Sequence, residues 1–160
     1  MRELGAEVAR DYDGREPLLV GTLKGCIPFV CDLSQALPIH HGLDFIELTG
    51  YGETEDDGIR FLKDLDTEIA GRDVLLVDSV VDTGLTMHYL TRSLALRNPG
   101  SLHIATLFER PYRRLVDELP VRYVGFTIPD EFFVGYGFDL DERYRNLPDL
   151  HLVRPGVVEI

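Results

Sequence analysis

The chain has few cysteines, no long apolar run and no apolar segment at its start. Its 160 residues include only two cysteines, Cys26 and Cys31, which are too few and too closely spaced for a disulfide framework or a zinc site. No apolar run approaches the roughly 20 residues that a membrane-spanning helix needs. The first residues also lack the apolar core of a secretory signal. We therefore expect a cytoplasmic protein with free thiols and no membrane partner.

Basic residues are scarce as well. There are 16 Lys and Arg against 28 Asp and Glu, which gives a net charge of −12. Because a surface this acidic repels polyanions, nucleic acid is not an expected partner. A small anionic substrate remains possible where backbone N–H groups, basic side chains or a divalent metal gather locally.

What is present is typical of one globular domain over residues 1–160, with 44% hydrophobic and 28% charged residues. Short apolar runs alternate with stretches of helical periodicity. The runs that predict strands are 17–23, 43–48, 74–77, 102–108, 121–126 and 150–153, with a return strand at 60–62. The stretches that predict helices are 3–10, 28–37 and the one following Thr86, where Met87, Leu90 and Leu94 share a face. This order predicts an α/β fold with a mainly parallel sheet.

The segment 77–86 carries the most chemical information. A buried strand runs into a polar loop with Asp82, Thr83, Gly84 and Thr86, and a helix follows. Backbone N–H groups in such a loop, with a helix N-terminus behind them, form a cradle for an anion. An alternative is that Asp82 and Thr83 only cap the helix, and spacing alone leaves both readings open.

The run 74–86 resembles the phosphoribosyl diphosphate motif of type I phosphoribosyltransferases, and it is most similar to the hypoxanthine-guanine branch. Other segments resemble that branch in order and spacing. They are the pyrophosphate loop 19–25, the mobile-loop tip Tyr51-Gly52, the following strand 62–66, and the purine-binding hood 124–139 with its continuation 141–148. The resemblance covers nearly the whole chain.

The resemblance implies a type I phosphoribosyltransferase fold, with a twisted parallel sheet flanked by helices. It also implies a small hood at about 127–150 with the N-terminal segment, and a mobile lid at about 49–58 that includes Gly50 and Tyr51. The implied reaction moves 5-phosphoribose from 5-phosphoribosyl 1-diphosphate to a purine-type base, with Mg²⁺. The family usually forms homodimers or homotetramers.

The resemblance further assigns roles to single residues. Asp82 would accept a proton from the purine, and the loop Asp82, Thr83, Gly84, Leu85 and Thr86 would hold the 5′-phosphate. The other expected contacts are Lys24, Gly25 and Arg145 with pyrophosphate, Asp78 and Ser79 with ribose, Arg110, Phe132, Phe133 and Asp139 with the base, and Asp139 and Asp78 with the metal. The Leu23–Lys24 peptide is expected to be cis.

Several positions depart from the family pattern. Asp78-Ser79 replaces a Glu-Asp pair, Arg110 replaces a lysine that binds the six-oxo group, and Gly50 replaces a serine. Glu131 and Phe133 make the hood more acidic and bulkier. From Arg110 and Phe133 we hypothesise a base other than plain hypoxanthine or guanine. These departures also leave open an alternative, a non-catalytic nucleotide-binding or accessory protein.

For two groups of residues a purely structural role is an alternative. Aromatic residues between glycines, such as Phe133, Tyr136 and Phe138, are more often core than a base platform. The basic group Arg110, Arg113 and Arg114 is also typical of a solvated helix start.

Overall fold

A six-stranded sheet forms the centre of the molecule. The computed structural model describes residues 1–49, 59–154 and 156. The strand order is β3-β2-β1-β4-β5-β6. All neighbours pair in parallel except β2 and β3. The strands are β1 (Leu18–Thr22), β2 (Gly42–Leu48), β3 (Phe61–Lys63), β4 (Asp73–Val81), β5 (Ser101–Glu109) and β6 (Val121–Thr127).

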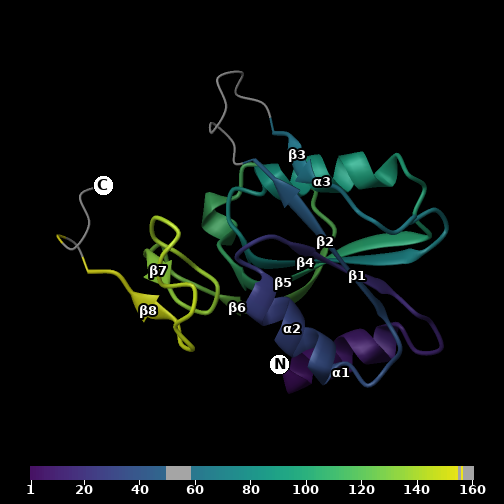
Figure 1. The fold of residues 1–160 in the computed structure, drawn as a ribbon, viewed down its shortest axis with the longest axis horizontal. Coiled ribbons are helices and arrows are strands. Elements are labelled where there is room, and N and C mark those ends of the chain that lie inside the picture. Colours follow the sequence, from purple (N-terminus) through teal and green to yellow (C-terminus); the bar gives the residue numbers. More distant parts are fainter. Residues whose placement is uncertain (50–58, 155, 157–160) are drawn as a thin grey trace.

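Helices cover both faces of this sheet, as the continuous apolar runs predict. The helices α1 (Arg2–Asp11) and α2 (Ile27–Ala36) lie on one face and α3 (Leu85–Ala95) lies on the other (Figure 1). Along β4, Leu75 and Val77 join the core under α1 and α2, whereas Val74 and Leu76 join the core under α3. The predicted α/β class is therefore confirmed.

The N-terminal helix belongs to the core, although the sequence analysis grouped this segment with the hood. Leu4, Val8 and Tyr12 are buried in the same cluster as α2 and the central strands. The Tyr123 hydroxyl of β6 also donates to Asp11 Oδ2, at 3.1 Å. The apolar face of α1 is covered by the sheet and α2, so this helix stabilises the core.

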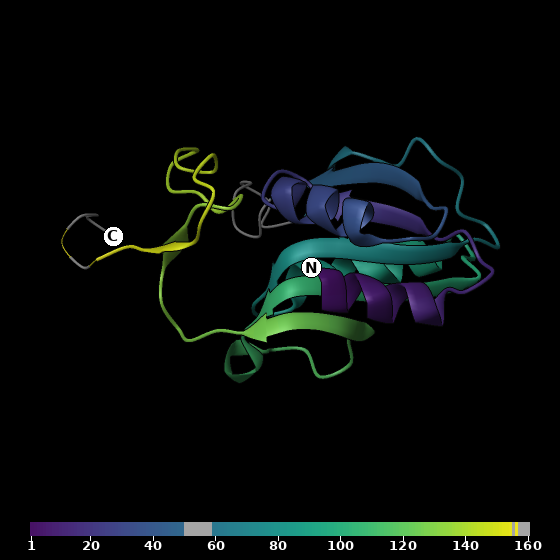
Figure 2. The same ribbon diagram turned by 90° about the horizontal axis from the view of Figure 1, so that it is seen from below.

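A small second sheet forms the hood beyond the carboxyl end of β6 (Figure 2). It consists of β7 (Phe133–Val134) and β8 (His151–Leu152), which pair antiparallel. The run 150–153 was predicted as the last strand, and it contains β8 of the hood. The chain between β7 and β8 folds into tight turns in which Gly135 and Gly137 have positive φ angles.

No helix among the residues described is long and apolar enough to cross a membrane.

A buried carboxylate fixes the turn that joins β3 to β4. Asp44 of β2 is 6% exposed. Its Oδ2 accepts the N–H groups of Asp66 and Thr67 at 3.0 and 2.9 Å, and Lys63 Nζ lies 3.5 Å from Oδ1. Burial acts to raise the pKa of Asp44, but the N–H donors of Phe45 and Thr67, together with Lys63, outweigh it and lower the pKa.

The variant Asp44→Asn should lose about 1–3 kcal/mol of unfolding free energy at pH 7, because buried N–H donors lose a charged acceptor. A lowered carboxylate pKa stabilises the fold above the unfolded pKa of about 4 and loses this effect as the pH falls. The deficit should therefore shrink in acid. Urea unfolding at pH 7 and at several pH values below 4 measures it, with the exposed Asp66→Asn as control. Equal losses for the two variants would contradict the assignment.

Candidate active site

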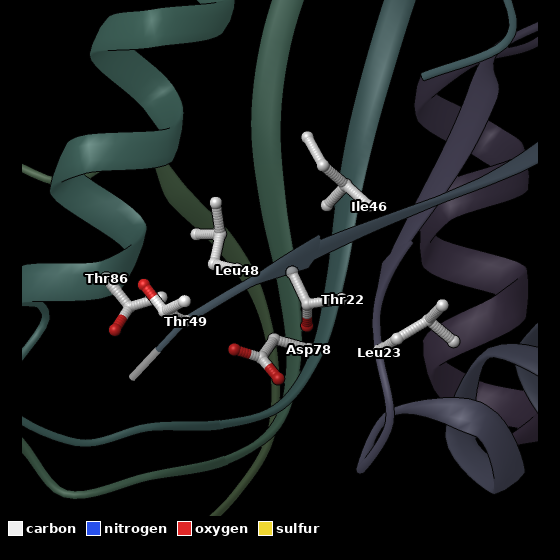
Figure 3. Close-up of a pocket in the computed structure, with 7 residues that line it drawn as sticks. All are labelled: Thr22, Leu23, Ile46, Leu48, Thr49, Asp78 and Thr86. Carbon is white, nitrogen blue, oxygen red and sulfur yellow. The ribbon is translucent and has the colours of Figure 1, made fainter. Parts of the chain in front are cut away.

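The strand order places a ligand site between β1 and β4. From β1 the next strand, β2, is added on one side, and from β4 the next strand, β5, is added on the other side. The order in which strands are added to the sheet therefore reverses between β1 and β4. Ligands of open α/β sheets bind at the carboxyl ends of the strands at such a switch point. A pocket lies there, lined by Thr22, Leu23, Ile46, Leu48, Thr49, Asp78 and Thr86 (Figure 3).

Asp78 is the acidic group of this pocket. Its side chain lies between Thr22 on one side and Thr49 and Thr86 on the other (Figure 3). Its Oδ1 accepts the Ser79 N–H at 2.8 Å. Desolvation raises the pKa of Asp78 to about 6, against the opposing effect of hydrogen bonds from Thr22, Ser79 and Val80. The carboxylate is thus ready to receive a hydroxyl or a cation, either of which would favour its charged form.

The loop after β4 is shorter than the sequence predicted. We placed the end of the strand at Val77, but β4 continues to Val81, because Val80 and Val81 pair with Phe108 and Glu109 of β5. The loop is therefore Asp82–Gly84. Gly84 has a φ of 85°, and a Cβ there would lie 2.8 Å from Leu119 Cδ1, so only glycine fits.

Helix α3 begins at Leu85, and no side chain caps it with a hydrogen bond. The Leu85 N–H donates to Thr83 Oγ1, but this bond is long, at 3.4 Å. The capping alternative for Asp82 is therefore wrong. The N–H groups of the first helical turn have no intrahelical partner and are available to an anion.

Two arginines face the Asp82 carboxylate. Arg113 Nε lies 3.1 Å from Oδ1, and Arg110 Nη1 lies 3.7 Å from Oδ2. The Oδ1 atom is buried and accepts no hydrogen bond within the described part of the chain. The two guanidinium groups therefore hold the Asp82 carboxylate in a fixed orientation beside the loop.

Sequence reasoning missed the position of Arg113. The sequence favoured a solvated helix start for this residue. In the structure, the short 3₁₀ helix η1 (Pro111–Arg113) returns toward the loop that follows β4. The Arg110 N–H donates to Val81 O, and the Leu115 N–H donates to Thr83 O. The usable signal was the close spacing of basic residues directly after a strand that neighbours β4.

The η1 segment also binds the start of the hood. Arg110 Nη2 donates to Glu131 O at 2.6 Å, and Arg113 Nη1 donates to Asp130 Oδ1 at 2.9 Å. The next residue, Phe132, is 49% exposed, so one large aromatic surface stays accessible beside Arg110. The predicted base-binding residues Arg110 and Phe132 are thereby brought to the Asp82 loop.

The predicted pyrophosphate residues meet where the hood touches the core. The Leu23–Lys24 peptide is cis, as the resemblance predicts. A Cβ on Gly137 would lie 2.0 Å from Gly25 O, so the backbones of hood and loop are in direct contact. Arg145 Nη1 donates to Gly137 O at 2.8 Å, which holds the guanidinium at this junction.

The carboxylates of Asp78 and Asp139 are the candidate ligands for Mg²⁺. This ion is usually held by one or two carboxylates together with phosphate oxygens of a substrate. No group of three or more Asp, Glu, His or Cys side chains suitable for a metal occurs in residues 1–49, 59–154 and 156. Asp78 faces the pocket, whereas Asp139 Oδ1 lies 2.8 Å from Arg145 Nη1. Asp78 therefore fits the role, whereas Asp139 is paired with Arg145.

The structure thus brings Asp78, Ser79, the 82–86 loop and Lys24-Gly25 to one edge of the sheet. The hood adds Phe132, Phe133, Asp139 and Arg145, and Arg110 lies between the two groups. Gly50 and Tyr51, the predicted lid residues, lie outside the described residues. Ser79 is buried and lies against Gly25, where a Cβ would meet Ser79 Oγ at 3.2 Å.

A switch-point phosphate cradle under a small hood is the architecture of a phosphoribosyltransferase. The family model described as "Phosphoribosyl transferase domain" matches residues 1–142. A crystal structure of a hypoxanthine-guanine phosphoribosyltransferase from Bacillus anthracis superimposes with a TM-score of 0.90 at 40% identity, covering 96% of this chain and 91% of that one.

More specifically, the chain belongs to the hypoxanthine-guanine phosphoribosyltransferase family. It is 45% identical over 158 residues to the Streptococcus agalactiae hypoxanthine-guanine phosphoribosyltransferase, covering 98% of this chain and 87% of that protein. The Trypanosoma cruzi hypoxanthine phosphoribosyltransferase, solved with its product IMP, has a TM-score of 0.90 at 35% identity, covering 98% and 89% of the two chains.

Asp78→Asn should stabilise the metal-free protein at neutral pH. A carboxyl whose pKa is raised by folding stabilises the fold below its unfolded pKa of about 4, and this effect is lost as the pH rises through its folded pKa. The advantage of the variant over the natural protein should therefore grow between pH 4 and pH 7, to the order of 1–3 kcal/mol. Urea unfolding in chelator measures it, with the exposed Asp141→Asn as charge control. A constant difference across this range would contradict the assignment.

Proposed function

We propose that the protein transfers 5-phosphoribose from 5-phosphoribosyl 1-diphosphate to a ring nitrogen of a purine base. The base would be hypoxanthine, guanine or a related analogue, and the products a nucleoside 5′-monophosphate and pyrophosphate. The observation that carries this proposal is the position of Asp82. It lies in an uncapped phosphate loop at the switch point, with a buried oxygen that accepts no hydrogen bond among the described residues.

In this proposal the loop residues 83–86 bind the 5′-phosphate through backbone N–H groups and threonine hydroxyls. Asp78 and Ser79 contact the ribose hydroxyls. Lys24, Gly25 and Arg145 bind the pyrophosphate, which places leaving-group charge between the core and the hood. Asp78 and Asp139 would hold Mg²⁺, which would neutralise phosphate charge. Stabilising the departing pyrophosphate and orienting the two reactants are the main tasks of the protein.

Asp82 would accept the proton that the purine loses when its nitrogen bonds to ribose. Arg113 keeps the carboxylate oriented, and its contact with Asp130 ties that orientation to the hood. Phe132 would stack on the base, and Phe133 and Asp139 would contact its edge. Because Arg113 contacts both Asp82 and the hood, the distance between the proton acceptor and a base bound under the hood would be fixed.

The choice of base depends on Arg110. Its side chain is 13% exposed and lies between Asp82 and the Glu131 carbonyl. A guanidinium at this place is a planar donor with fixed N–H directions, whereas lysine offers a rotatable point charge, so the two residues suit different groups at the six position of the base. An altered base preference therefore stays our prediction. We further propose a homodimer or homotetramer acting in the cytoplasm.

Asp82→Asn should bind nucleoside monophosphate but release pyrophosphate at least about 100-fold more slowly, because an amide cannot accept the proton. Coupled detection of pyrophosphate with hypoxanthine or guanine measures the rate, and thermal unfolding verifies the fold. Asp13→Asn, the same substitution at an exposed residue just after α1, serves as control. Nucleotide binding without turnover on any base in the natural protein would favour the non-catalytic alternative.

Arg110→Lys should shift base selection toward hypoxanthine and guanine. We expect the ratio of their kcat/KM to that of purines altered at the six position to rise by about fivefold, a difference of roughly 1 kcal/mol. Steady-state assays over a panel of bases measure the ratio for both proteins. If the natural protein already uses hypoxanthine or guanine far better than every analogue, the altered-preference hypothesis is wrong.

A further inference from the structure

One carboxylate holds both side chains that we expect to bind pyrophosphate. Glu142 Oε2 lies 3.0 Å from Lys24 Nζ, and Glu142 Oε1 lies 3.0 Å from Arg145 Nη2. Lys24 comes from the core loop after β1, whereas Glu142 and Arg145 come from the hood. The two cations therefore meet an anion before any substrate arrives.

The backbone of the hood directs Glu142 to this place. Leu140 and Arg143 exchange two N–H···O bonds, of 3.1 and 3.0 Å, around a two-residue turn. Asp141 and Glu142 at its tip have φ angles of 50° and 61°. The Glu142 N–H donates to Asp139 Oδ2 at 3.0 Å. Glutamate is an unusual residue for a left-handed position, which glycine and asparagine favour. An observed conformational cost of this kind points to a role for the side chain.

The two contacts imitate those of a phosphoryl group. Two oxygens on one carbon each face a separate cation, as two oxygens on one phosphorus would. Hydrogen bonds from Lys24 and Arg145 lower the pKa of Glu142, so the carboxylate is charged throughout the neutral range. A pyrophosphate that binds Lys24 and Arg145 would compete with this carboxylate for their charge and their N–H groups.

We propose that Glu142 is an internal counter-anion that competes with pyrophosphate for Lys24 and Arg145 and so sets the affinity of the site. This proposal rests on the proposed function, which assigns those two cations to pyrophosphate. Glu142 would weaken the binding of the product and assist its departure by returning to the cations. It would also keep two positive side chains at the core–hood junction from binding other small anions.

The opposite role is a scaffold, in which Glu142 only holds Lys24 and Arg145 in position. The two roles predict opposite signs. When the charge of a competitor is removed, pyrophosphate binds more tightly, whereas removing the charge of a scaffold makes it bind more weakly. Glu142→Gln is the matched substitution, because it keeps the shape and hydrogen-bonding capacity of the side chain and removes only its charge.

Calorimetric titration of the full chain with magnesium pyrophosphate measures the affinity. Both ion pairs are solvent-exposed and individually weak, so Glu142→Gln should bind pyrophosphate about fivefold more tightly. The gain should shrink in high salt, which screens exposed charges. Asp141→Asn, which removes the same charge from the neighbouring residue of the turn, should change the affinity by less than about 1.5-fold. Inhibition of the forward reaction by pyrophosphate should strengthen in the same proportion.

Unchanged or weaker binding by Glu142→Gln, or an equal gain in Asp141→Asn, would overturn the proposal. Arg145→Gln separates this failure from that of the proposed function. If Arg145→Gln loses pyrophosphate binding, the proposed pyrophosphate site is supported, and the affinity of Glu142→Gln alone decides whether Glu142 is a competitor. If Arg145→Gln binds as the natural protein does, pyrophosphate binds elsewhere and both proposals fall. Thermal unfolding of each variant verifies that its fold is retained.

Discussion

The parallel pairing of β1 with β4 is the constraint on which the site depends. Leu18 to Gly21 pair in register with Val74 to Val77, so β1 ends beside β4, which continues to Val81. Both are buried on both faces, and a one-residue shift in register would turn every side chain to the wrong core. Because this register is fixed, the loops that follow the strands are fixed as well. Lys24 and Asp82 are far apart in sequence, yet they reach the same edge of the sheet from adjacent strands.

Much of the fold could be predicted from local pattern. The apolar runs located six strands of the structure because each buried strand needs a short, nearly continuous apolar sequence. The pattern failed where pairing rather than burial extends a strand. Residues 78–81 read as a polar loop because Asp78 and Ser79 interrupt the apolar run, but β5 supplies partners as far as Val81. The last run was predicted as a strand, but its sheet could not be predicted, because a two-residue strand carries no signal of its partner.

The site was predictable where a motif resembles a family and unpredictable where tertiary contacts decide. The resemblance led to the 82–86 loop, Lys24 and Arg145. It could not show that Arg113 pairs with Asp82, since that contact depends on how η1 turns back across the end of the sheet. It also could not show that Glu142 faces both Lys24 and Arg145. In a chain of net charge −12, most cations of the site already have carboxylate partners, so ligand binding is an exchange of counter-ions.

The pairing of β7 with β8 has a practical consequence for handling the protein. His151 and Leu152 form the only strand paired with Phe133 and Val134 among the residues described, so the hood sheet depends on this short carboxyl-side segment. The amino end, by contrast, enters α1 at the core, away from the hood (Figure 1). An affinity tag or fusion partner therefore belongs at the amino end, where it leaves the hood unobstructed.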